Sequence, residues 1–377
     1  MLSRFLLVIG MLAGAFTTLI AASAETSARW RVLYFYDELQ SSLVINDFKF
    51  MTAERGIAAG FLVDHKGKIK ATAITSNDGG AHWTLVPLKE VPLSVFFLDE
   101  NRGWMVGDRF LWSSADGGRT WAKLSQLDDA VRVYFANQDR GWAVGEQKTV
   151  YETTDGGKAW KPVPAAAQPD STAERTVYNW IDFANPKVGI ITGWNQPPGR
   201  TISGLPEWMN PESTRFRKET PRVSIFLQTR DSGKTWDPTT GSLFGHVTCV
   251  RLSPAGFGLG LIEFSEAFEW PSEVFRIDWT TGKSQRVFRE KSRLITDVAL
   301  PPTGPAYLAG IEKMDKLIDS PVPGKLKVMK SDDWSNWQEM EVDYRATAHR
   351  ALLSAVDDRN IWVATDTGMI LKLAAPK

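Results

Sequence analysis

Four aspartates recur at a regular spacing along the chain and are the first candidates for acid–base or metal chemistry. Each stands in the pattern Ser/Thr-x-Asp-x-Gly-x-x-Trp, which spans residues 76–83, 114–121, 153–160 and 229–236. The same residue types suit a tight turn, because the carboxylate accepts backbone N–H groups and glycine adopts a positive φ without steric cost. The tryptophan then begins a strand and packs its ring against the hairpin. We therefore interpret the repeated residues as structural turn elements: Asp78, Asp116, Asp155, Asp231, Trp83, Trp121, Trp160 and Trp236.

The other reactive side chains do not form a pattern typical of a metal centre. The four histidines are widely spaced, and no two of them have the spacing His-x-x-x-His. The single cysteine, Cys249, stands in an apolar run and is interpreted as a small core residue. Zinc and other transition metals need several His, Cys or carboxylate ligands in one cluster. The sequence therefore predicts neither a metal nor a cofactor.

The composition excludes some classes of protein and favours an all-β fold. Lys plus Arg number 44 and Asp plus Glu number 44, so the 377-residue chain has no basic excess with which to bind nucleic acid. Hydrophobic residues make up 43%, which is enough for a folded core. The 16 Trp residues, 30 Gly and 20 Pro favour many short strands joined by turns.

The first 24 residues have the pattern of a secretory signal peptide. Arg4 is the only charge, residues 5–22 are uncharged and mostly apolar, and Ala22-Ser23-Ala24 is a cleavage site of the Ala-x-Ala type. An uncleaved membrane anchor is the alternative, because 18 residues is near the lower limit for a span. We expect cleavage after Ala24 and an exported, periplasmic protein. A mature chain with one cysteine has no intramolecular disulfide, which fits a bacterial envelope.

The spacing of the repeat indicates the architecture. The aspartates are separated by 116 − 78 = 38, 155 − 116 = 39 and 231 − 155 = 76 residues, the last being two units, and a degraded fifth copy spans 331–337. A period near 40 with this turn chemistry is typical of a β-propeller blade.

A second pattern, an apolar strand, a polar turn and a strand that usually contains glycine, gives the number of blades. Its seven copies span 47–60, 95–107, 133–145, 181–193, 250–262, 298–310 and 352–364. The last blade has only three strands of its own, and residues 28–34 resemble a fourth strand. We therefore predict one seven-bladed β-propeller over 25–377, with its ring closed by the N-terminal strand in the last blade.

The turns and a third motif together resemble a known family. Arg-Gly-Trp-x-Val-Gly spans 102–107 and 140–145. Combined with the Asp-box (BNR) turns, it resembles the photosystem II stability and assembly factor family, most clearly over 95–160. The resemblance implies an exported, non-enzymatic propeller that holds membrane-protein subunits during assembly through an arginine-rich patch. A long insertion and weak late repeats depart from the family, and relatives occur in bacteria that do not photosynthesise, so the resemblance identifies no photosystem client.

Sialidases also carry Asp boxes, so a glycosidase is the competing interpretation. Their Phe/Tyr-Arg-Ile-Pro motif precedes the first box, whereas the nearest string here, Phe275-Arg276-Ile277-Asp278, follows the fourth box and lacks proline. We interpret it as the third strand of blade five. A carbohydrate-active enzyme or a lectin remains the alternative function, with a glycan as the alternative partner.

The longest insertion, about 195–222 in blade four, is the predicted binding element. Long loops on a rigid scaffold often carry function, and this one offers an aromatic anchor and several cations. We expect it on the face opposite the Asp boxes, and expect its deletion over 200–219 to abolish partner capture. The predicted binding residues are Trp208, Arg215, Arg217, Lys218, Trp270 and Arg175. The predicted function is a scaffold that binds protein partners and assists a membrane-protein complex.

Overall fold

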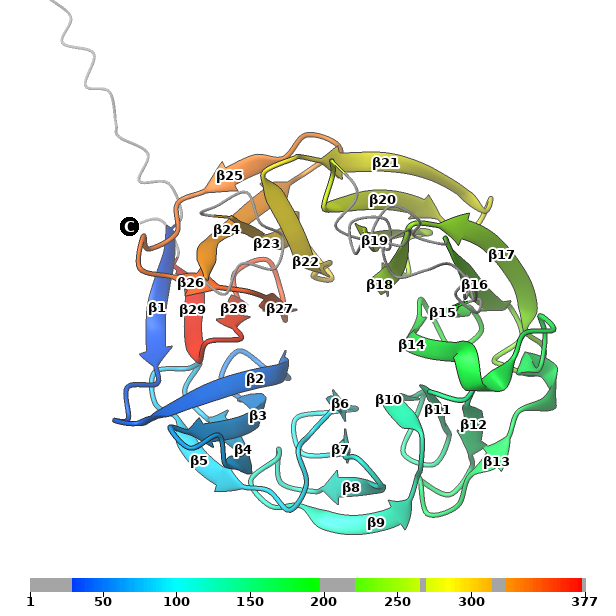
Figure 1. Cartoon of the computed structure of the whole chain (residues 1–377), viewed down its shortest axis with the longest axis horizontal. Coiled ribbons are helices and arrows are strands. Elements are labelled where there is room, and N and C mark those ends of the chain that lie inside the picture. Colours follow the sequence, from blue (N-terminus) through cyan, green and yellow to red (C-terminus); the bar gives the residue numbers. More distant parts are fainter. Residues whose placement is uncertain (1–28, 197–220, 265–268, 314–322, 375–377) are drawn as a thin grey trace, which may run out of the picture.

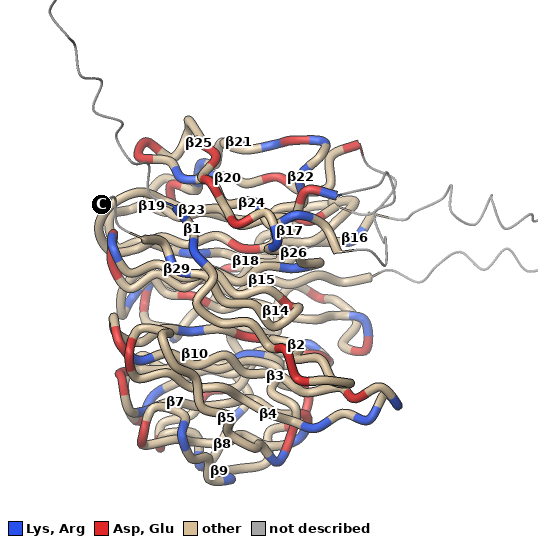
Figure 2. The backbone as a smooth tube through the Cα atoms, turned by 90° about the vertical axis from the view of Figure 1, so that its left-hand side faces the viewer, with Lys and Arg blue, Asp and Glu red and all other residues tan. Residues whose placement is uncertain are grey.

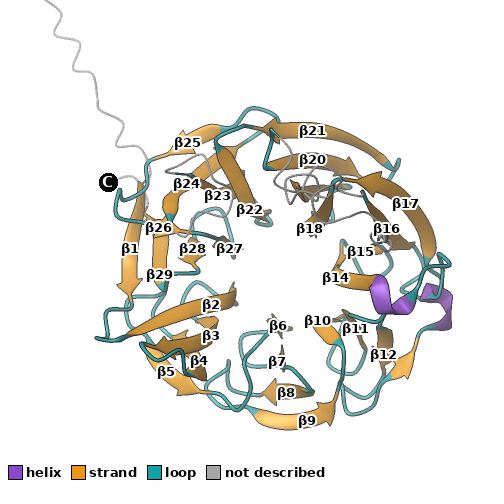
Figure 3. Ribbon diagram, in the orientation of Figure 1, coloured by secondary structure: helices purple, strands orange, loops and turns teal. Residues whose placement is uncertain are grey.

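The computed structural model describes residues 29–196, 221–264, 269–313 and 323–374. Seven antiparallel sheets are arranged around a central axis, each with its first strand innermost and its fourth strand outermost (Figure 1). Strands dominate the described residues, with two short 3-10 helices, η1 (Pro164–Ala166) and η2 (Ala173–Arg175), in one connection (Figure 3). The predicted all-β seven-bladed propeller is therefore confirmed.

We number the blades in chain order, and each blade begins with the strand that lies nearest the central axis. Blade 1 comprises β2 (Ser41–Phe50), β3 (Gly56–Asp64), β4 (Ile69–Ser76) and β5 (Thr84–Pro87). Blade 2 comprises β6 (Ser94–Phe97), β7 (Gly103–Val106), β8 (Phe110–Ser114) and β9 (Ala122–Gln126). Blade 3 comprises β10 (Ala130–Phe135), β11 (Gly141–Gly145), β12 (Val150–Thr153) and β13 (Lys161–Pro162).

The remaining blades follow the same order. Blade 4 comprises β14 (Thr176–Phe183), β15 (Gly189–Asn195), β16 (Arg222–Thr229) and β17 (Asp237–Leu243). Blade 5 comprises β18 (Gly245–Leu252), β19 (Phe257–Phe264), β20 (Ser272–Asp278) and β21 (Lys283–Arg289). Blade 6 comprises β22 (Arg293–Ala299), β23 (Ala306–Glu312), β24 (Gly324–Ser331) and β25 (Gln338–Met340), with β26 (Thr347–Ala348) paired to β24. Blade 7 comprises β27 (Ala351–Ala355), β28 (Ile361–Thr365), β29 (Met369–Ala374) and β1 (Arg29–Phe35).

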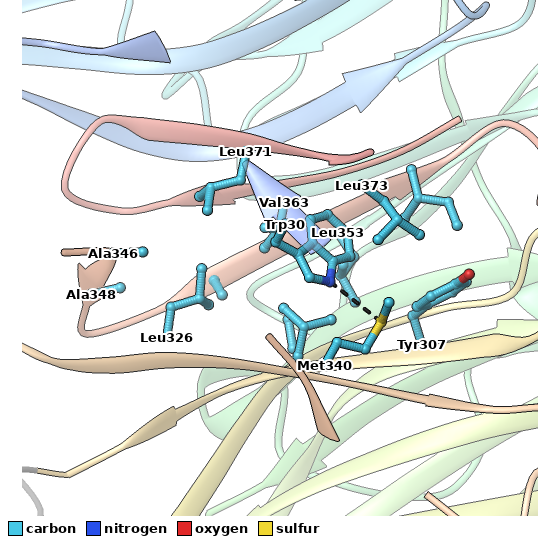
Figure 4. Packing of buried hydrophobic residues seen from close by; sticks show 14 of the residues in the cluster. Trp30, Tyr307, Leu326, Met340, Ala346, Ala348, Leu353, Val363, Leu371 and Leu373 are labelled. Carbon is cyan, nitrogen blue, oxygen red and sulfur yellow. Dashed lines mark hydrogen bonds between the residues drawn. The ribbon is translucent and has the colours of Figure 1, made fainter. Parts of the chain in front are cut away.

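The N-terminal strand closes the ring, as the sequence predicts. β1 pairs antiparallel with β29, from Arg29 opposite Ala374 to Phe35 opposite Met369. Trp30 anchors this strand: it is only 2% exposed, packs in a cluster between blades 6 and 7, and its Nε1 donates to Met340 Sδ at 3.4 Å (Figure 4). Closure leaves no blade with an unfilled fourth-strand position.

The connections divide between the two faces of the ring, which Figure 2 shows edge-on. The Asp-box face carries the turns between first and second strands and between third and fourth strands, such as 51–55 and 77–83. The loop face carries the connections between second and third strands, such as 65–68, and those that lead into the next blade. The two 3-10 helices belong to the loop face. No helix of the described residues is long and apolar enough to cross a membrane.

Stacked rings join neighbouring blades near the Asp-box face. Trp104 of blade 2 stacks on Phe135 of blade 3, with ring centroids 3.7 Å apart, and its Nε1 donates to the carbonyl oxygen of Gly156 at 3.0 Å. A Cβ at position 141 would lie 2.6 Å from the Phe135 ring, so the glycine of Arg-Gly-Trp makes room for this stack. The motif therefore encodes an inter-blade joint.

The same joint occurs where the ring closes. Trp362 of blade 7 stacks on Phe50 of blade 1, with centroids 3.6 Å apart, and its Nε1 donates to the Gly79 carbonyl oxygen at 2.9 Å. The last blade is thus attached to the first by side chains as well as by β1.

Candidate functional site

The Asp-box residues lie in the hairpin turns between third and fourth strands. In the second box the Ser114 hydroxyl donates to Asp116 Oδ1 at 2.8 Å, and Asp116 accepts the Thr120 backbone N–H at 2.9 Å. Gly117 and Gly118 have φ of +75° and +87°, which side chains disfavour. Asp78, Asp155 and Asp231 make the corresponding bonds in the other three boxes.

The box tryptophans pack edge-on against the innermost phenylalanine of their own blade. Trp83, Trp121, Trp160 and Trp236 have ring centroids 5.9, 6.1, 6.1 and 6.1 Å from Phe50, Phe97, Phe135 and Phe183. Because the carboxylates are engaged with their own turns, these residues have the contacts of structural elements.

The fourth and fifth boxes vary this scheme. Ser232 replaces the first glycine and has φ +67°, and the Nε1 of Trp142, the equivalent of Trp104, has no partner among the described residues. In the degraded fifth copy, Asp333 accepts the Ser331 hydroxyl at 3.0 Å and two backbone N–H groups. In the fifth copy the aspartate therefore keeps its turn hydrogen bonds although the copy contains no glycine.

The predicted binding residues fall into two groups. Trp208, Arg215, Arg217 and Lys218 lie outside the described residues. The segment that contains them leaves the ring after Asn195 and returns at Arg222, on the loop face.

Trp270 and Arg175 are described and lie on the loop face in different blades. Trp270 is half-buried under two cations, with Arg289 Cζ 4.9 Å and Lys291 Nζ 5.2 Å from its ring centroid. Arg175 is exposed at the end of η2. Neither residue lines the central cavity described next. The string 275–278 lies in β20, the third strand of blade 5, as predicted.

The innermost strands enclose a cavity of about 290 Å³ around the central axis. Blades 1, 3, 4, 5 and 6 each place charged side chains at this cavity or at its wall, although the strands that carry them are mostly apolar. These charged residues are Asp47, Lys49, Arg132, Asp182, Arg251 and Asp297. Because three are cations and three are carboxylates, their partners decide what charge the cavity offers to a ligand.

The carboxylates are used to join blades. Asp47 accepts the backbone N–H of Phe48 and, across the blade boundary, that of Val95, both at 2.9 Å. Asp297 makes the same pair of bonds to Val298 and Leu353, both at 2.8 Å. These bonds tie β2 to β6 and β22 to β27 at equivalent positions.

Asp182 has a similar role between blades 4 and 5. Its Oδ2 accepts the Leu252 backbone N–H at 2.7 Å. Burial raises the pKa of Asp182, whereas Arg251 and the backbone bonds oppose this rise. All three carboxylates therefore have backbone partners that hold them in the wall of the cavity.

The two arginines lie against one tryptophan. The guanidinium carbons of Arg132 and Arg251 lie 4.0 and 4.7 Å from the Trp180 ring centroid, and Trp180 Nε1 donates to the Val250 carbonyl oxygen at 2.6 Å. Their closest carboxylate contacts are long, 3.9 Å from Arg132 to Asp47 and 3.8 Å from Arg251 to Asp297. Donors of both guanidinium groups are therefore left for a ligand.

Lys49 is the most available cation of the cavity. Its side chain keeps contact with solvent, and it has no hydrogen bond or ion pair with the described residues. The surrounding ring desolvates the ammonium group and lowers its pKa, and the charge of Arg251 adds to this effect. The charges of Asp47, Asp182 and Asp297 oppose this fall, and a ligand carboxylate placed beside Lys49 would stabilise the ammonium group further.

More cations lie on the loop face, at the start of β16 and in the connection before β27. Arg222 lies with its Cζ 5.7 Å from the Trp194 ring centroid and its Nη1 3.4 Å from His246 Nδ1. Burial, followed by Arg222 and Arg350, lowers the pKa of His246 to about 4, so this imidazole is neutral at pH 7. Arg350 contacts Glu263 of blade 5 at 3.5 Å. Arg222 and Arg350 therefore lie on the loop face, whereas the residues that line the cavity lie near the Asp-box ends of the innermost strands.

Sequence reasoning missed the channel residues. Each is a charged residue in a mostly apolar strand, and the signal was its position just before or within the seven aligned strand pairs. In blades 1, 3, 4, 5 and 6 a β-bulge occurs at the same step of the innermost strand, between residues such as Ile45 and Asp47. A bulge re-aims the side chains that follow it, which periodicity alone does not reveal.

The fold and the site together define an Asp-box propeller with a cation-bearing central channel. Residues 123–198 match the family model described as photosynthesis system II assembly factor YCF48. This match overlaps the region in which the motifs are clearest, and the resemblance predicted from the sequence is therefore confirmed. No match was found among the curated proteins.

Solved structures with the same architecture include two of YCF48. The chain is 15% identical to YCF48 bound to D1 peptide, with a TM-score of 0.58 over 92% of this chain and 97% of that chain. YCF48 from Cyanidioschyzon merolae is also 15% identical, with a TM-score of 0.56 over 92% and 99%. A GH74 xyloglucanase from Xanthomonas campestris is 11% identical, with a TM-score of 0.60 over 91% of this chain and 53% of that chain. At these identities the likeness concerns the fold.

Proposed function

We propose that the chain is an exported, non-enzymatic scaffold that binds protein partners through its central channel and loop face, and that it assists the assembly or stability of a membrane-protein complex. The observation that carries this proposal is which charged side chains of the channel have hydrogen-bond partners and which do not. The carboxylates accept backbone bonds between blades, whereas the Lys49 ammonium group makes no hydrogen bond or ion pair with the described residues and interacts with Asp47, Asp182 and Asp297 through their charge alone.

The chemistry of the channel selects the partner. A polypeptide segment with a carboxylate, either an acidic side chain or a free C-terminus, would accept hydrogen bonds from Lys49, Arg132 and Arg251. Arg222 and Arg350 on the loop face would attract the same segment as it approaches the ring from that side. The complex of YCF48 with D1 peptide supports a peptide ligand for this kind of propeller.

Export and the blade-four insertion belong to the same proposal. The signal-like residues 1–24 would place the protein in the periplasm, beside the exposed parts of membrane-protein subunits. The insertion over 195–222 leaves and re-enters the ring on the loop face, and in this proposal Trp208 and its neighbouring cations contact the same partner. Trp270 and Arg175 would extend this contact around the ring.

The contacts of the channel carboxylates do not favour a catalytic role. A glycosidase needs one carboxyl group as acid and another as nucleophile or base. Asp47, Asp182 and Asp297 instead accept backbone N–H groups that join neighbouring blades. The xyloglucanase likeness, at 11% identity, supports the fold and adds no catalytic residue.

Affinity capture from solubilised envelope tests the proposal. The tagged mature chain should enrich membrane-protein subunits, identified by quantitative mass spectrometry. Lys49→Met removes the charge and keeps the length of the side chain, and it should lower this enrichment about tenfold, the loss of one charge-assisted contact. Lys161→Met, at an exposed position on β13, is the matched control and should capture as much as the parent.

Two results would contradict the proposal. One is equal capture by the parent and by Lys49→Met, which would remove the channel from the site. The other is turnover of a xyloglucan or sialoside panel, which would support the glycan-active alternative instead.

A further inference from the structure

Exposed apolar side chains gather where β1 closes the ring. Of the eight large hydrophobic side chains that are exposed among the described residues, five lie on β1, on the connection to β2, or on β4 and β5 of blade 1. They are Leu33, Phe35, Leu39, Ile69 and Leu85. A concentration of this kind on one sector is typical of an interaction surface.

Three of these side chains line a single groove of about 510 Å³, which we call the seam groove. Phe35 is 56% exposed, Leu39 is 93% exposed and Leu85 is 43% exposed. Tyr34, Tyr36 and Trp83 line the same groove. It therefore combines aromatic walls with unburied aliphatic side chains, which is the composition of a binding hot spot.

The walls of the seam groove are held in place before any partner binds. Trp83 Nε1 donates to the Gly80 carbonyl oxygen at 2.9 Å, and the Trp83 ring centroid lies 5.9 Å from that of Tyr34. Tyr36 is fixed by its hydroxyl contact with Ser41 at 2.8 Å. Its backbone N–H also donates to the Gly368 carbonyl oxygen at 3.2 Å. Preformed walls reduce the entropy lost on binding.

The charge of the seam groove indicates which partner it fits. Asp37 and Glu38 line it, are exposed, and have no ion pair with the described residues. Lys66, Lys68 and Lys70, on the β3–β4 hairpin, do not line the groove. A concave apolar groove with two free carboxylates is complementary to a cation flanked by apolar groups, and it repels the headgroups of an anionic lipid surface.

We propose that the seam groove binds an apolar segment of a partner protein that carries a basic side chain. Leu39, Phe35 and Leu85 would contact the apolar residues of this segment. Asp37 and Glu38 would receive the lysine or arginine, with the tyrosine and tryptophan rings beside it. This surface is separate from the channel and does not depend on the function proposed for the channel.

Fluorescence anisotropy with two labelled ten-residue peptides tests the inference. One alternates leucine with arginine and the other alternates leucine with glutamate. The arginine peptide should bind saturably and the glutamate peptide should not. Because exposed ion pairs are weak, Asp37→Asn with Glu38→Gln should reduce affinity about fivefold. Leu39→Ser should reduce it about tenfold through lost apolar contact.

The controls separate this surface from others. Tyr344→Ser alters an apolar side chain that is 83% exposed in blade 6, and Lys49→Met alters the channel; both should bind the arginine peptide as the parent does. Equal binding by the Asp37/Glu38 double variant would overturn the inference. So would equal binding of both peptides, or saturable binding to phosphatidylglycerol vesicles that Leu39→Ser abolishes, which would identify a lipid contact instead.

Discussion

On the Asp-box face the turn of one blade is bonded to its neighbours, whereas on the loop face the connections differ from blade to blade. The Gly79 and Gly156 carbonyl oxygens each accept an indole N–H from the preceding blade, and the turn N–H groups of the same glycines donate to turns of their own blade. The loop face instead carries two 3-10 helices and exposed apolar tips such as Leu39 and Tyr344.

This difference shows how one repeat can serve two purposes. Turns that must join blades are limited to a few residue types, so they recur with a period near 40. Connections on the other face join blades through bonds that differ from place to place, such as Lys148 N–H to the Thr176 carbonyl oxygen, so their length and chemistry can vary and they can contact partners. In the channel the carboxylates join blades through backbone N–H groups, and Arg132 and Arg251 both reach across a blade boundary to Trp180.

The largest expected effect comes from breaking an inter-blade joint. Trp104 is 3% exposed and stacks on Phe135, so Trp104→Ala should lower the free energy of unfolding by about 3–5 kcal/mol. Trp270→Ala, on the loop face, should lower it by about 1 kcal/mol, because that ring is half-buried under two cations. Urea denaturation monitored by circular dichroism compares the two. Equal losses would remove the distinction between the faces.

A smaller effect is expected from a single box carboxylate. Asp116→Ala removes the acceptor of the Ser114 hydroxyl and the Thr120 N–H and should lower stability by about 1–2 kcal/mol, with partner capture unchanged. Asp128→Ala, in a turn on the loop face, should change stability by less than about 0.5 kcal/mol. Thermal melts and the capture assay are read together. Loss of capture in Asp116→Ala without loss of stability would contradict the structural role of the box.

The smallest expected effect is the acid sensitivity of the boxes. Backbone N–H groups, from His82 and from Thr235, are the main cause that lowers the pKa of Asp78 and of Asp231 to about 2. The unfolded chain therefore binds more protons than the folded chain between about pH 4 and pH 2. The stabilisation is complete above about pH 4 and is lost as the pH falls through about 2.

The measurement is the urea midpoint as a function of pH. Asp78→Asn with Asp231→Asn should flatten the fall of the midpoint below pH 4, and Asp128→Asn should leave the fall as it is in the parent. An identical slope in all three proteins would show that the acid sensitivity has another origin.

The parts of the structure that could be predicted from the sequence are those set by local chemistry. The Asp-box turns and the Arg-Gly-Trp strands each need particular residues within a few positions, so the repeat indicates the seven blades and the closing strand. Residues 29–35 could be recognised as a fourth strand because they resemble the strand that follows a box tryptophan.

The channel and the seam groove could not be predicted in the same way, because they depend on contacts between distant segments. Asp47 and Asp297 are equivalent only after their strands bulge and meet the next blade. The seam groove exists only because β1 pairs with β29 and then passes beside blade 1. Trp270 and Arg175 were expected on the loop face, and they lie there. Neither residue lines the channel cavity.

Photo-crosslinking from inside the channel tests the central claim most directly. Tyr134 lines the cavity, and a benzoylphenylalanine placed there should crosslink to an acidic or C-terminal segment of a membrane-protein subunit, identified by mass spectrometry. The same probe at His82, whose side chain is 90% exposed on the Asp-box face, should give no such product. Crosslinks from position 82 and none from position 134 would contradict the account, because the partner would then bind the face assigned here to structure alone.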